Sequence, residues 1–168
     1  MKKYILLIFL LSATVFAQSA CKLTVDSKTG KPMLVGKLDR QAFLDSNFAA
    51  WFNMQYNFYK PDTQVIKLIA PKLKDKKIEI VMGTWCSDSR REVPRLFKIF
   101  DLAKVPPKNI EVIAVSRKMK APAHLTDSLS IERVPTVIVY NGKKEMGRII
   151  ETPVETLEKD LENIVDKK

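Results

Sequence analysis

One short segment of this chain has residue types suited to covalent chemistry: Gly83-Thr84-Trp85-Cys86-Ser87-Asp88-Ser89. It follows a β-rich run, residues 77–82, and opens a segment with helical periodicity. At such a strand-to-helix turn, unpaired backbone N–H groups stabilise negative charge, so a cysteine there is favoured as the nucleophilic thiolate. Ser89 stands three residues after Cys86, where a redox pair would carry its second sulfur. The segment therefore predicts thiol chemistry with a single sulfur.

Nearby charges act on Cys86 in opposite directions. Arg90 and Arg91 favour a thiolate, whereas Asp88 opposes it. Because the helix start adds to the effect of the arginines, we expect a thiolate and take Cys86 as the candidate nucleophile. The alternative is that Cys86 is an inert, small hydrophobic residue on a redox-inactive scaffold.

The first residues have the features of a secretory signal peptide. Lys2 and Lys3 give a positive start, residues 4–16 are almost wholly apolar, and Ala17 ends a run suited to signal peptidase. The apolar run is shorter than the ~20 residues that span a bilayer. We therefore predict that residues 1–17 are removed and that the protein is exported, to a periplasmic or extracellular location.

Cys21, the second of the two cysteines, has two possible roles. Ser19-Ala20-Cys21 resembles the end of a lipobox, and lipidation of Cys21 would tether the protein to a membrane, although Gln18 stands where such a box usually carries Leu. Alternatively, Cys21 is a resolving thiol for Cys86, delivered by a flexible, polar N-terminal segment in which it is not buried. Two cysteines provide no disulfide framework for the fold.

Charge and composition exclude several classes of function. The 168-residue chain has 29 Lys and Arg and 19 Asp and Glu, and removal of residues 1–17 leaves 27 basic residues against 19 acidic ones. An exported protein whose lysines are not clustered with aromatic residues does not fit nucleic-acid binding. The lone His124 has no second histidine with which to form a metal site. We expect no metal and no cofactor.

Residues 18–60 are predicted to form an N-terminal extension. Its elements are a strand at residues 33–35, a helix over residues 40–44 capped by Asp39, and a longer helix from Ser46. The longer helix places aromatic residues on one face, at Phe48, Trp51, Phe52, Tyr56 and Tyr59. We interpret these rings as core beneath a sheet, with a binding groove as the alternative.

Residues 61–168 are predicted to form one α/β domain, in which a first helix precedes elements in the order β-α-β-α-β-β-α. The predicted elements are a helix capped by Asp62 or Thr63 and kinked or ended by Pro71, a strand at 78–82, a helix at 87–103, a strand at 110–115, a helical turn near 125–129, strands at 136–140 and 145–150, and a last helix. Asn141-Gly142 signals a hairpin between the last two strands. The last helix is predicted to begin at Thr152, with Pro153 in the first position and Glu155 completing a capping box.

A second segment is predicted to meet Cys86 in space: Val134-Pro135-Thr136, directly before a strand. A proline there cannot donate a ladder hydrogen bond, so a special reason for it is expected. One such reason is a cis peptide bond, which turns the preceding backbone groups toward an incoming chain.

These residues resemble the thioredoxin-like superfamily. Its members carry Trp-Cys-x-x-Cys at a strand-to-helix turn, a proline eight residues after the first cysteine and a cis-proline before the facing hairpin; the matching positions here are Trp85, Cys86, Ser89, Pro94 and Pro135. The resemblance covers residues 65–168. It implies a thioredoxin-like three-layer α/β/α sandwich with a mixed central sheet, to which residues 18–60 add an N-terminal helical extension.

The sequence departs from the family pattern at two linked positions. Ser89 replaces the resolving cysteine, and Ile80 stands where thioredoxins have a buried acid that handles protons during resolution. A serine cannot release a mixed disulfide, but it can hydrogen-bond a thiolate. Without a resolving thiol to deprotonate, the buried acid has no task, so the two departures agree.

The resemblance implies thiol–disulfide exchange on exported proteins and a role in redox homeostasis. Cys86, assisted by Ser89, would form mixed disulfides with protein thiols or disulfides, while Trp85, Val134 and Pro135 bind the client. A client thiol, a small thiol or a reductant oxidoreductase would resolve the intermediate. The alternative is a non-enzymatic client-binding module on a redox-inactive thioredoxin fold. A peroxidase is disfavoured because the Thr-x-x-Cys approach is absent.

Overall fold

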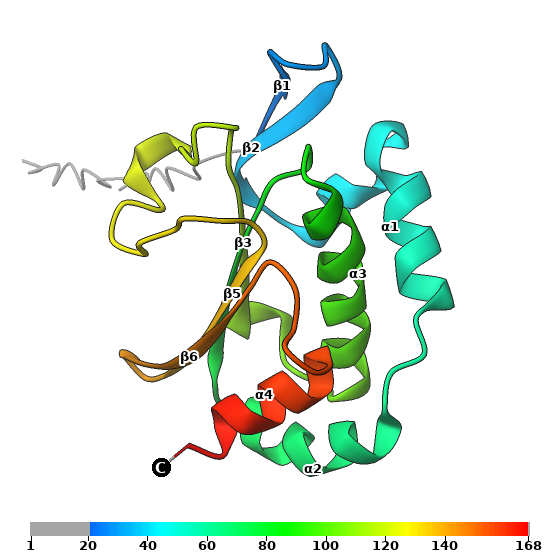
Figure 1. Ribbon diagram of the computed structural model, residues 1–168, viewed down its shortest axis with the longest axis vertical. Coiled ribbons are helices and arrows are strands. Elements are labelled where there is room, and N and C mark those ends of the chain that lie inside the picture. The colour runs from blue at the N-terminus through cyan, green and yellow to red at the C-terminus, as the bar shows by residue number, and fades with distance from the viewer. Residues whose placement is uncertain (1–20, 168) are drawn as a thin grey trace, which may run out of the picture.

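The computed structural model describes residues 21–167 (Figure 1). The predicted signal peptide, residues 1–17, lies outside the described residues. Within residues 21–167, no helix has the length and apolar character needed to cross a membrane.

A six-stranded mixed sheet forms the centre of the molecule, in the order β1-β2-β4-β3-β5-β6. The strands are β1 (Lys22–Val25), β2 (Pro32–Leu38), β3 (Lys77–Met82), β4 (Ile110–Ala114), β5 (Thr136–Asn141) and β6 (Lys144–Ile150). β3 and β4 are parallel, and all other neighbours are antiparallel. The N-terminal extension therefore adds two strands to the sheet as well as helices.

Four α-helices share one core cluster on one face of the sheet: α1 (Ser46–Phe58), α2 (Thr63–Leu73), α3 (Ser87–Leu102) and α4 (Leu157–Val165). α1 packs against α3, and α2 packs against α4 (Figure 1). Alternation along β3 explains the division, because Ile78, Ile80 and Met82 face this cluster while Val81 belongs to a second one. The predicted α/β fold with its mixed sheet and N-terminal helical extension is confirmed.

The other face of the sheet is covered by residues 116–134, here called the covering segment (Figure 1). Its one helical element is a 3-10 turn at Pro122–His124, slightly earlier than the turn predicted near residues 125–129. Ala123 and His124 have φ values of 54° and 57°. This left-handed backbone is incompatible with a longer helix, which explains the shift.

Aspartates cap the N-terminal helices, as the sequence predicts for Asp39 and Asp62. Asp39 accepts a hydrogen bond from the backbone at the start of the 3-10 helix Arg40–Leu44, Asp45 caps α1, and Asp62 caps α2 through two backbone N–H groups. Pro71 lies inside α2, which continues to Leu73.

The predicted start of the last helix is wrong. α4 begins after Thr156, whose side chain accepts a backbone N–H one turn further on, and not after Thr152. The carboxylate of Asp160 instead accepts the backbone N–H groups of residues 154 and 155, at 2.8 and 3.2 Å. The segment that carries the capping-box pattern is therefore held as a loop folded onto the first turn of α4.

The aromatic residues predicted to share one face of the long N-terminal helix pack on the core, as predicted, whereas Phe58 at the end of α1 is 81 % exposed. Phe48 and Phe52 are buried, whereas Trp51, Tyr56 and Tyr59 are half-buried and pack against the same cluster. Phe52 contacts Phe97 of α3 with ring centroids 5.7 Å apart. Aromatic contacts thus join the N-terminal extension to the helix that begins at Cys86.

Candidate active site

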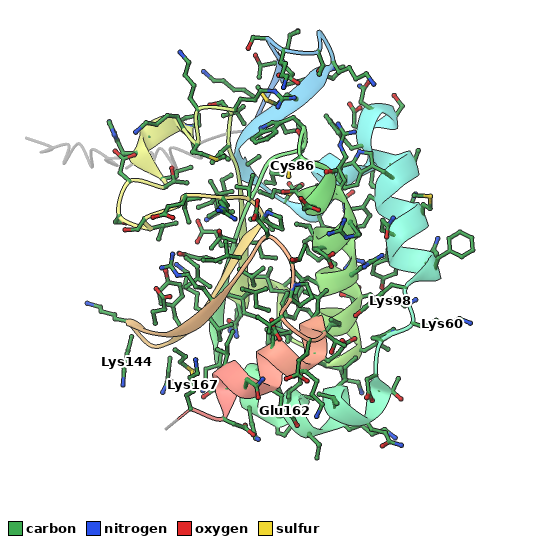
Figure 2. The ribbon with its side chains drawn as sticks, in the orientation of Figure 1. Lys60, Cys86, Lys98, Lys144, Glu162 and Lys167 are labelled. Carbon is green, nitrogen blue, oxygen red and sulfur yellow. The ribbon has the colours of Figure 1, made fainter. Side chains whose placement is uncertain are left out.

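Cys86 is the N-cap residue of α3, at the end of the loop that follows β3 (Figure 2). Its thiol is partly exposed and donates a hydrogen bond to the carbonyl oxygen of Val134, with a sulfur–oxygen distance of 3.2 Å. The Val134–Pro135 peptide bond is cis, as the sequence predicts. The two segments that were expected to meet, at Cys86 and at Pro135, are therefore in direct contact.

Ser89 lies beneath the thiol turn and is fully buried. Its Oγ accepts a hydrogen bond from the backbone N–H of Gly83 at 3.1 Å. This bond fastens the first turn of α3 to the end of β3. The bond to sulfur expected from the sequence is not formed between these two described residues in the thiol state.

Trp85 is held by a hydrogen bond from the edge of its ring and lies close to the backbone of Gly83. Its Nε1–H donates to the carbonyl oxygen of Val115 at 2.9 Å. A Cβ atom added to Gly83 would lie 2.6 Å from the ring of Trp85, so a side chain at this position would displace the indole. Gly83 is therefore required by the close approach of the ring to the backbone.

The two arginines expected to act on Cys86 have other partners. Arg90 donates from Nε to the carbonyl oxygen of Thr84 at 2.5 Å. Arg91 pairs with Asp88 at 2.8 Å and with Glu92 at 2.5 Å. The charge of Arg91 is thus largely balanced within α3.

A third arginine, which sequence reasoning missed, lies at the site. The guanidinium carbon of Arg117 is 4.7 Å from the ring centroid of Trp85, within the range of a cation–π contact. Two parallel hydrogen bonds, of 2.6 and 2.7 Å, join Arg117 to the carboxylate of Asp26. The bonds from Arg117 and Thr29 hold the pKa of Asp26 well below its usual range. The two residues are 91 positions apart, and no sequence pattern links them.

The N-terminal strands also reach the site through Thr84. Its fully buried Oγ1 accepts a hydrogen bond from the backbone N–H of Leu34 in β2 at 3.0 Å. Asp26, in the turn between β1 and β2, is 2 % exposed. The bonds from Leu34 to Thr84 and from Arg117 to Asp26 form only while the hairpin is docked, so the hairpin and the thiol turn form one structural unit.

The two cysteines, both free, lie against different clusters. Cys86 packs on the thiol-side cluster, whose buried members are Val81, Val115 and Val134. Cys21 packs on the main core and is half-buried, which corrects the expectation that it is unburied. Burial raises the pKa of the Cys21 thiol. Among residues 21–167 no group of His, Cys, Asp and Glu could hold a metal ion.

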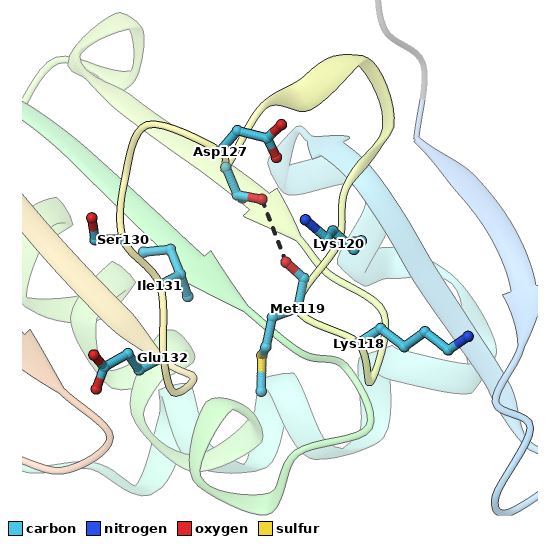
Figure 3. Close-up of a pocket in the computed structure, with 8 residues that line it drawn as sticks. Lys118, Met119, Lys120, Asp127, Ser130, Ile131 and Glu132 are labelled. Carbon is cyan, nitrogen blue, oxygen red and sulfur yellow. Dashed lines mark hydrogen bonds between the residues drawn. The ribbon is translucent and has the colours of Figure 1, made fainter.

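A cavity of about 370 Å³ opens in the covering segment beside the thiol-side cluster. Figure 3 shows its lining, which combines apolar side chains with charges of both signs: Lys118, Met119, Lys120, Thr126, Asp127, Ser130, Ile131 and Glu132. Met119 and Ile131 also pack against the thiol-side cluster. Met119 and Ile131 therefore lie between the cavity and the cluster on which Cys86 packs.

The connection of the strands, the helix after β3 and the cis-proline before β5 are those of a thioredoxin-like fold. No family model and no curated protein matches the chain.

Solved structures are similar to the chain at low identity. A protein of unknown function from Pseudomonas aeruginosa matches with 18 % identity and a TM-score of 0.52, over 76 % of this chain and 89 % of that one. Oxidised thioredoxin O2 from Arabidopsis thaliana has 17 % identity and a TM-score of 0.41, over 64 % and 90 %. Oxidised mitochondrial thioredoxin 3 from Saccharomyces cerevisiae has 20 % identity and a TM-score of 0.40, over 65 % and 98 %. These similarities concern the fold alone.

Proposed function

We propose that this protein carries out thiol–disulfide exchange on exported proteins through Cys86. The observation that carries the proposal is the position of the sulfur. It is partly exposed at the first turn of a 16-residue helix and lies 3.2 Å from the carbonyl of Val134, beside cis-Pro135. A helix start favours a thiolate, and the neighbouring backbone offers hydrogen bonds to an extended client.

The reaction has two balanced exchange steps. The Cys86 thiolate, having lost its proton to solvent, attacks one sulfur of a client disulfide. A Cys86–client disulfide forms, and the other client sulfur leaves as a thiolate, which takes up a proton. A second thiol, from the client, a small molecule or another oxidoreductase, then attacks the mixed disulfide and regenerates Cys86. No net oxidation occurs when the client supplies both sulfurs, so the cycle isomerises its disulfides.

The side chains around the sulfur have distinct roles in this proposal. Trp85 shapes the rim beside Cys86, and Val134 with Pro135 contacts the client backbone. Ser89 is a positioning residue, since its hydroxyl is bonded to Gly83. Because Ser89 cannot resolve the intermediate, complete reduction of a client requires an external thiol.

Export and the role of Cys21 belong to the same proposal. Cys21 either resolves the mixed disulfide or carries a lipid that tethers the protein. A Cys21–Cys86 disulfide in the oxidised chain of residues 18–168 would support the first role, and acylated Cys21 would support the second. Cys21 contacts the main core, and a resolving thiol would first have to leave that contact. The contact therefore does not favour the resolving role, and it gives no support to lipidation either.

The rate of alkylation of Cys86 against pH tests the proposal, on residues 18–168 with Cys21→Ser. We expect a rate that stays high well below pH ~8.5, the ordinary value for a thiol. Cys86→Ser should abolish mixed-disulfide formation with a disulfide-bonded client. An ordinary thiol profile, or exchange that survives Cys86→Ser, would overturn the proposal.

A client-binding module is the second candidate, and two features favour it. The site has one sulfur, and the cavity in the covering segment is large enough for a side chain of a bound polypeptide. This function predicts that binding of an unfolded client survives Cys86→Ala. Binding that disappears with the sulfur supports exchange instead.

A further inference from the structure

A half-buried ion pair links the N-terminal hairpin, which consists of β1, β2 and their turn, to the candidate active site. Asp26 lies in the turn and is 2 % exposed, and its two carboxylate oxygens accept from Nε and one terminal nitrogen of Arg117. Thr29 and the backbone N–H of Lys28 also donate to this carboxylate. The paired fork geometry fixes the plane of the guanidinium as well as its distance.

The guanidinium so fixed lies over the indole next to the nucleophile. It stacks 4.7 Å from the ring centroid of Trp85, the residue directly before Cys86. The indole is itself held by Val115, and both Trp85 and Cys86 pack on the thiol-side cluster. Hydrogen bonds to Asp26 raise the pKa of Arg117.

Most charged side chains around the thiol turn have a partner, and Arg117 is no exception, since it pairs with Asp26; what distinguishes Arg117 is its contact with the ring of Trp85. The charged side chains from the elements around Cys86 are Asp88, Arg90 and Arg91 on α3, Arg117, Glu132 and Arg133 in the covering segment, Glu151 after β6, and Asp26 in the hairpin. Arg91 pairs with Asp88, and Arg133 pairs with Glu151 at 2.8 Å. Arg90 turns to a carbonyl oxygen and to the ring of Trp51, 5.9 Å away.

We propose that Asp26 is a positioning residue that holds Arg117 against Trp85, where Arg117 is the cation that stabilises the Cys86 thiolate. This inference rests on the proposed exchange function. The N-terminal hairpin is then a part of the active site. A positive charge near sulfur favours the thiolate and, in the mixed disulfide, improves Cys86 as a leaving group.

The test is the pH at which alkylation of Cys86 is half-maximal, measured on residues 18–168 with Cys21→Ser. Arg117→Gln removes the charge and should raise this midpoint by about 0.5–1 pH unit, as expected for loss of one nearby cation. Arg117→Lys keeps the charge and should restore most of the shift. Lys31→Gln is the matched control, because it removes an exposed positive charge in the turn that carries Asp26 and should leave the midpoint within about 0.2 unit.

The reagent separates two effects of the charge. Neutral iodoacetamide reports the thiolate alone, whereas anionic iodoacetate is also attracted by a nearby cation. A midpoint change seen with both reagents supports the proposal. A change in the rate of the anionic reagent alone, with an unchanged midpoint, would overturn it.

Asp26→Asn tests the positioning role. If Asp26 holds Arg117 in place, its loss lets the guanidinium leave Trp85, and the midpoint rises as in Arg117→Gln. If Asp26 only neutralises Arg117, the midpoint falls, and the positioning role is overturned. Far-UV circular dichroism checks the fold of each variant, and Arg117→Lys provides the readout should Asp26→Asn unfold.

Failure of this inference is distinguishable from failure of the proposed function. If alkylation of Cys86 in the parent protein follows the pH profile of an ordinary thiol, both the role of Arg117 and the proposed exchange function are overturned. An activated profile that Arg117→Gln leaves unchanged removes the role of Arg117 and keeps the exchange function.

Discussion

At the scale of single residues, the site is organised by hydrogen bonds whose partners differ from those suggested by residue type. Ser89 stands where a resolving cysteine would be, yet its oxygen serves the backbone of Gly83. Arg90 and Arg91 are adjacent to the thiol turn in sequence, yet they bind Thr84 and two carboxylates. Position in the sequence therefore identifies the site better than it identifies the role of each side chain.

Ser89→Ala should destabilise the protein by about 1–3 kcal/mol, because it leaves the buried N–H of Gly83 without a partner. Urea denaturation measures this change. Ser87→Ala is the control, since Ser87 is exposed in the same turn and should change stability by less than about 0.5 kcal/mol. A stable Ser89→Ala protein with an altered alkylation profile would instead place Ser89 on the sulfur.

Sequence reasoning located Cys86, the candidate nucleophile, and its facing proline because both depend on local patterns. Cys86 follows a strand and opens a helix, and Pro135 precedes a hairpin strand. Asp26 and Arg117 were not predictable, because their pairing depends on two loops that are brought together only by the sheet order. Two residues that are 91 positions apart form no periodic pattern from which their contact could be predicted.

At the scale of elements, buried carboxylates hold loops in place by hydrogen bonds that sequence patterns do not predict. Glu158 of α4 is 1 % exposed. Its carboxylate oxygens accept a hydrogen bond from the hydroxyl of Tyr59, at 2.9 and 3.0 Å, and one from the backbone N–H of Asp62, at 3.3 Å. The chain between α1 and α2 is thereby tied to α4. Burial, together with the charge of Glu158, raises the pKa of Tyr59 above its ordinary value.

Glu158→Gln should lower the free energy of unfolding by about 1–3 kcal/mol, since the new amide N–H groups would face existing donors. Tyr59→Phe should cost less, and the double variant should show a coupling of about 0.5–3 kcal/mol. Urea denaturation of the four proteins of this cycle gives the coupling. Glu155→Gln, at an exposed position near the start of the same helix, is the control. Additive effects of the two substitutions would contradict a direct bond.

The start of α4 shows why element boundaries are hard to predict. Thr152 and Pro153 form a good local start signal, but the carboxylate of Asp160 binds the preceding loop and moves the start to Thr156. Both caps obey the same local rule. Whether the helix starts after Thr152 or after Thr156 depends on how the preceding loop packs against neighbouring strands and helices. That packing is a property of the tertiary structure and not of the local sequence.

The docked hairpin should make stability depend on pH through Asp26. Its pKa is lowered in the folded protein, so its stabilising contribution is present above about pH 4, the unfolded value, and is lost as pH falls through the folded value. The midpoint of urea unfolding should therefore fall more steeply from pH 5 to pH 2.5 in the parent protein than in Asp26→Asn. Parallel pH profiles of the two proteins would contradict this prediction.

At the scale of the whole molecule, the N-terminal extension and the thioredoxin-like part share one core. Leu34, Phe43 and Phe48 from the extension belong to the same buried cluster as Phe97 and Leu161. The boundary predicted between residues 60 and 61 marks the end of the resemblance in sequence. It does not divide the core, because β2 pairs with β4 and α1 packs on α3.

The described chain should consequently unfold in one transition. Trp51 reports on α1 and Trp85 on the thiol turn, so Trp51→Phe and Trp85→Phe leave one fluorescent reporter in each part. The urea midpoint by fluorescence should coincide with the midpoint by far-UV circular dichroism within each variant. A Trp51 signal that changes at lower urea than the helical signal would show that the extension unfolds separately.

The hydrogen bond from the Cys86 thiol to Val134 has one more consequence. While the sulfur keeps its proton, it occupies the carbonyl beside cis-Pro135 that an arriving backbone N–H would use. Ionisation removes the thiol donor and at the same moment vacates this acceptor. In the proposed exchange reaction, the loss of this one proton would therefore prepare the sulfur for attack and free the carbonyl oxygen for a client backbone in the same step.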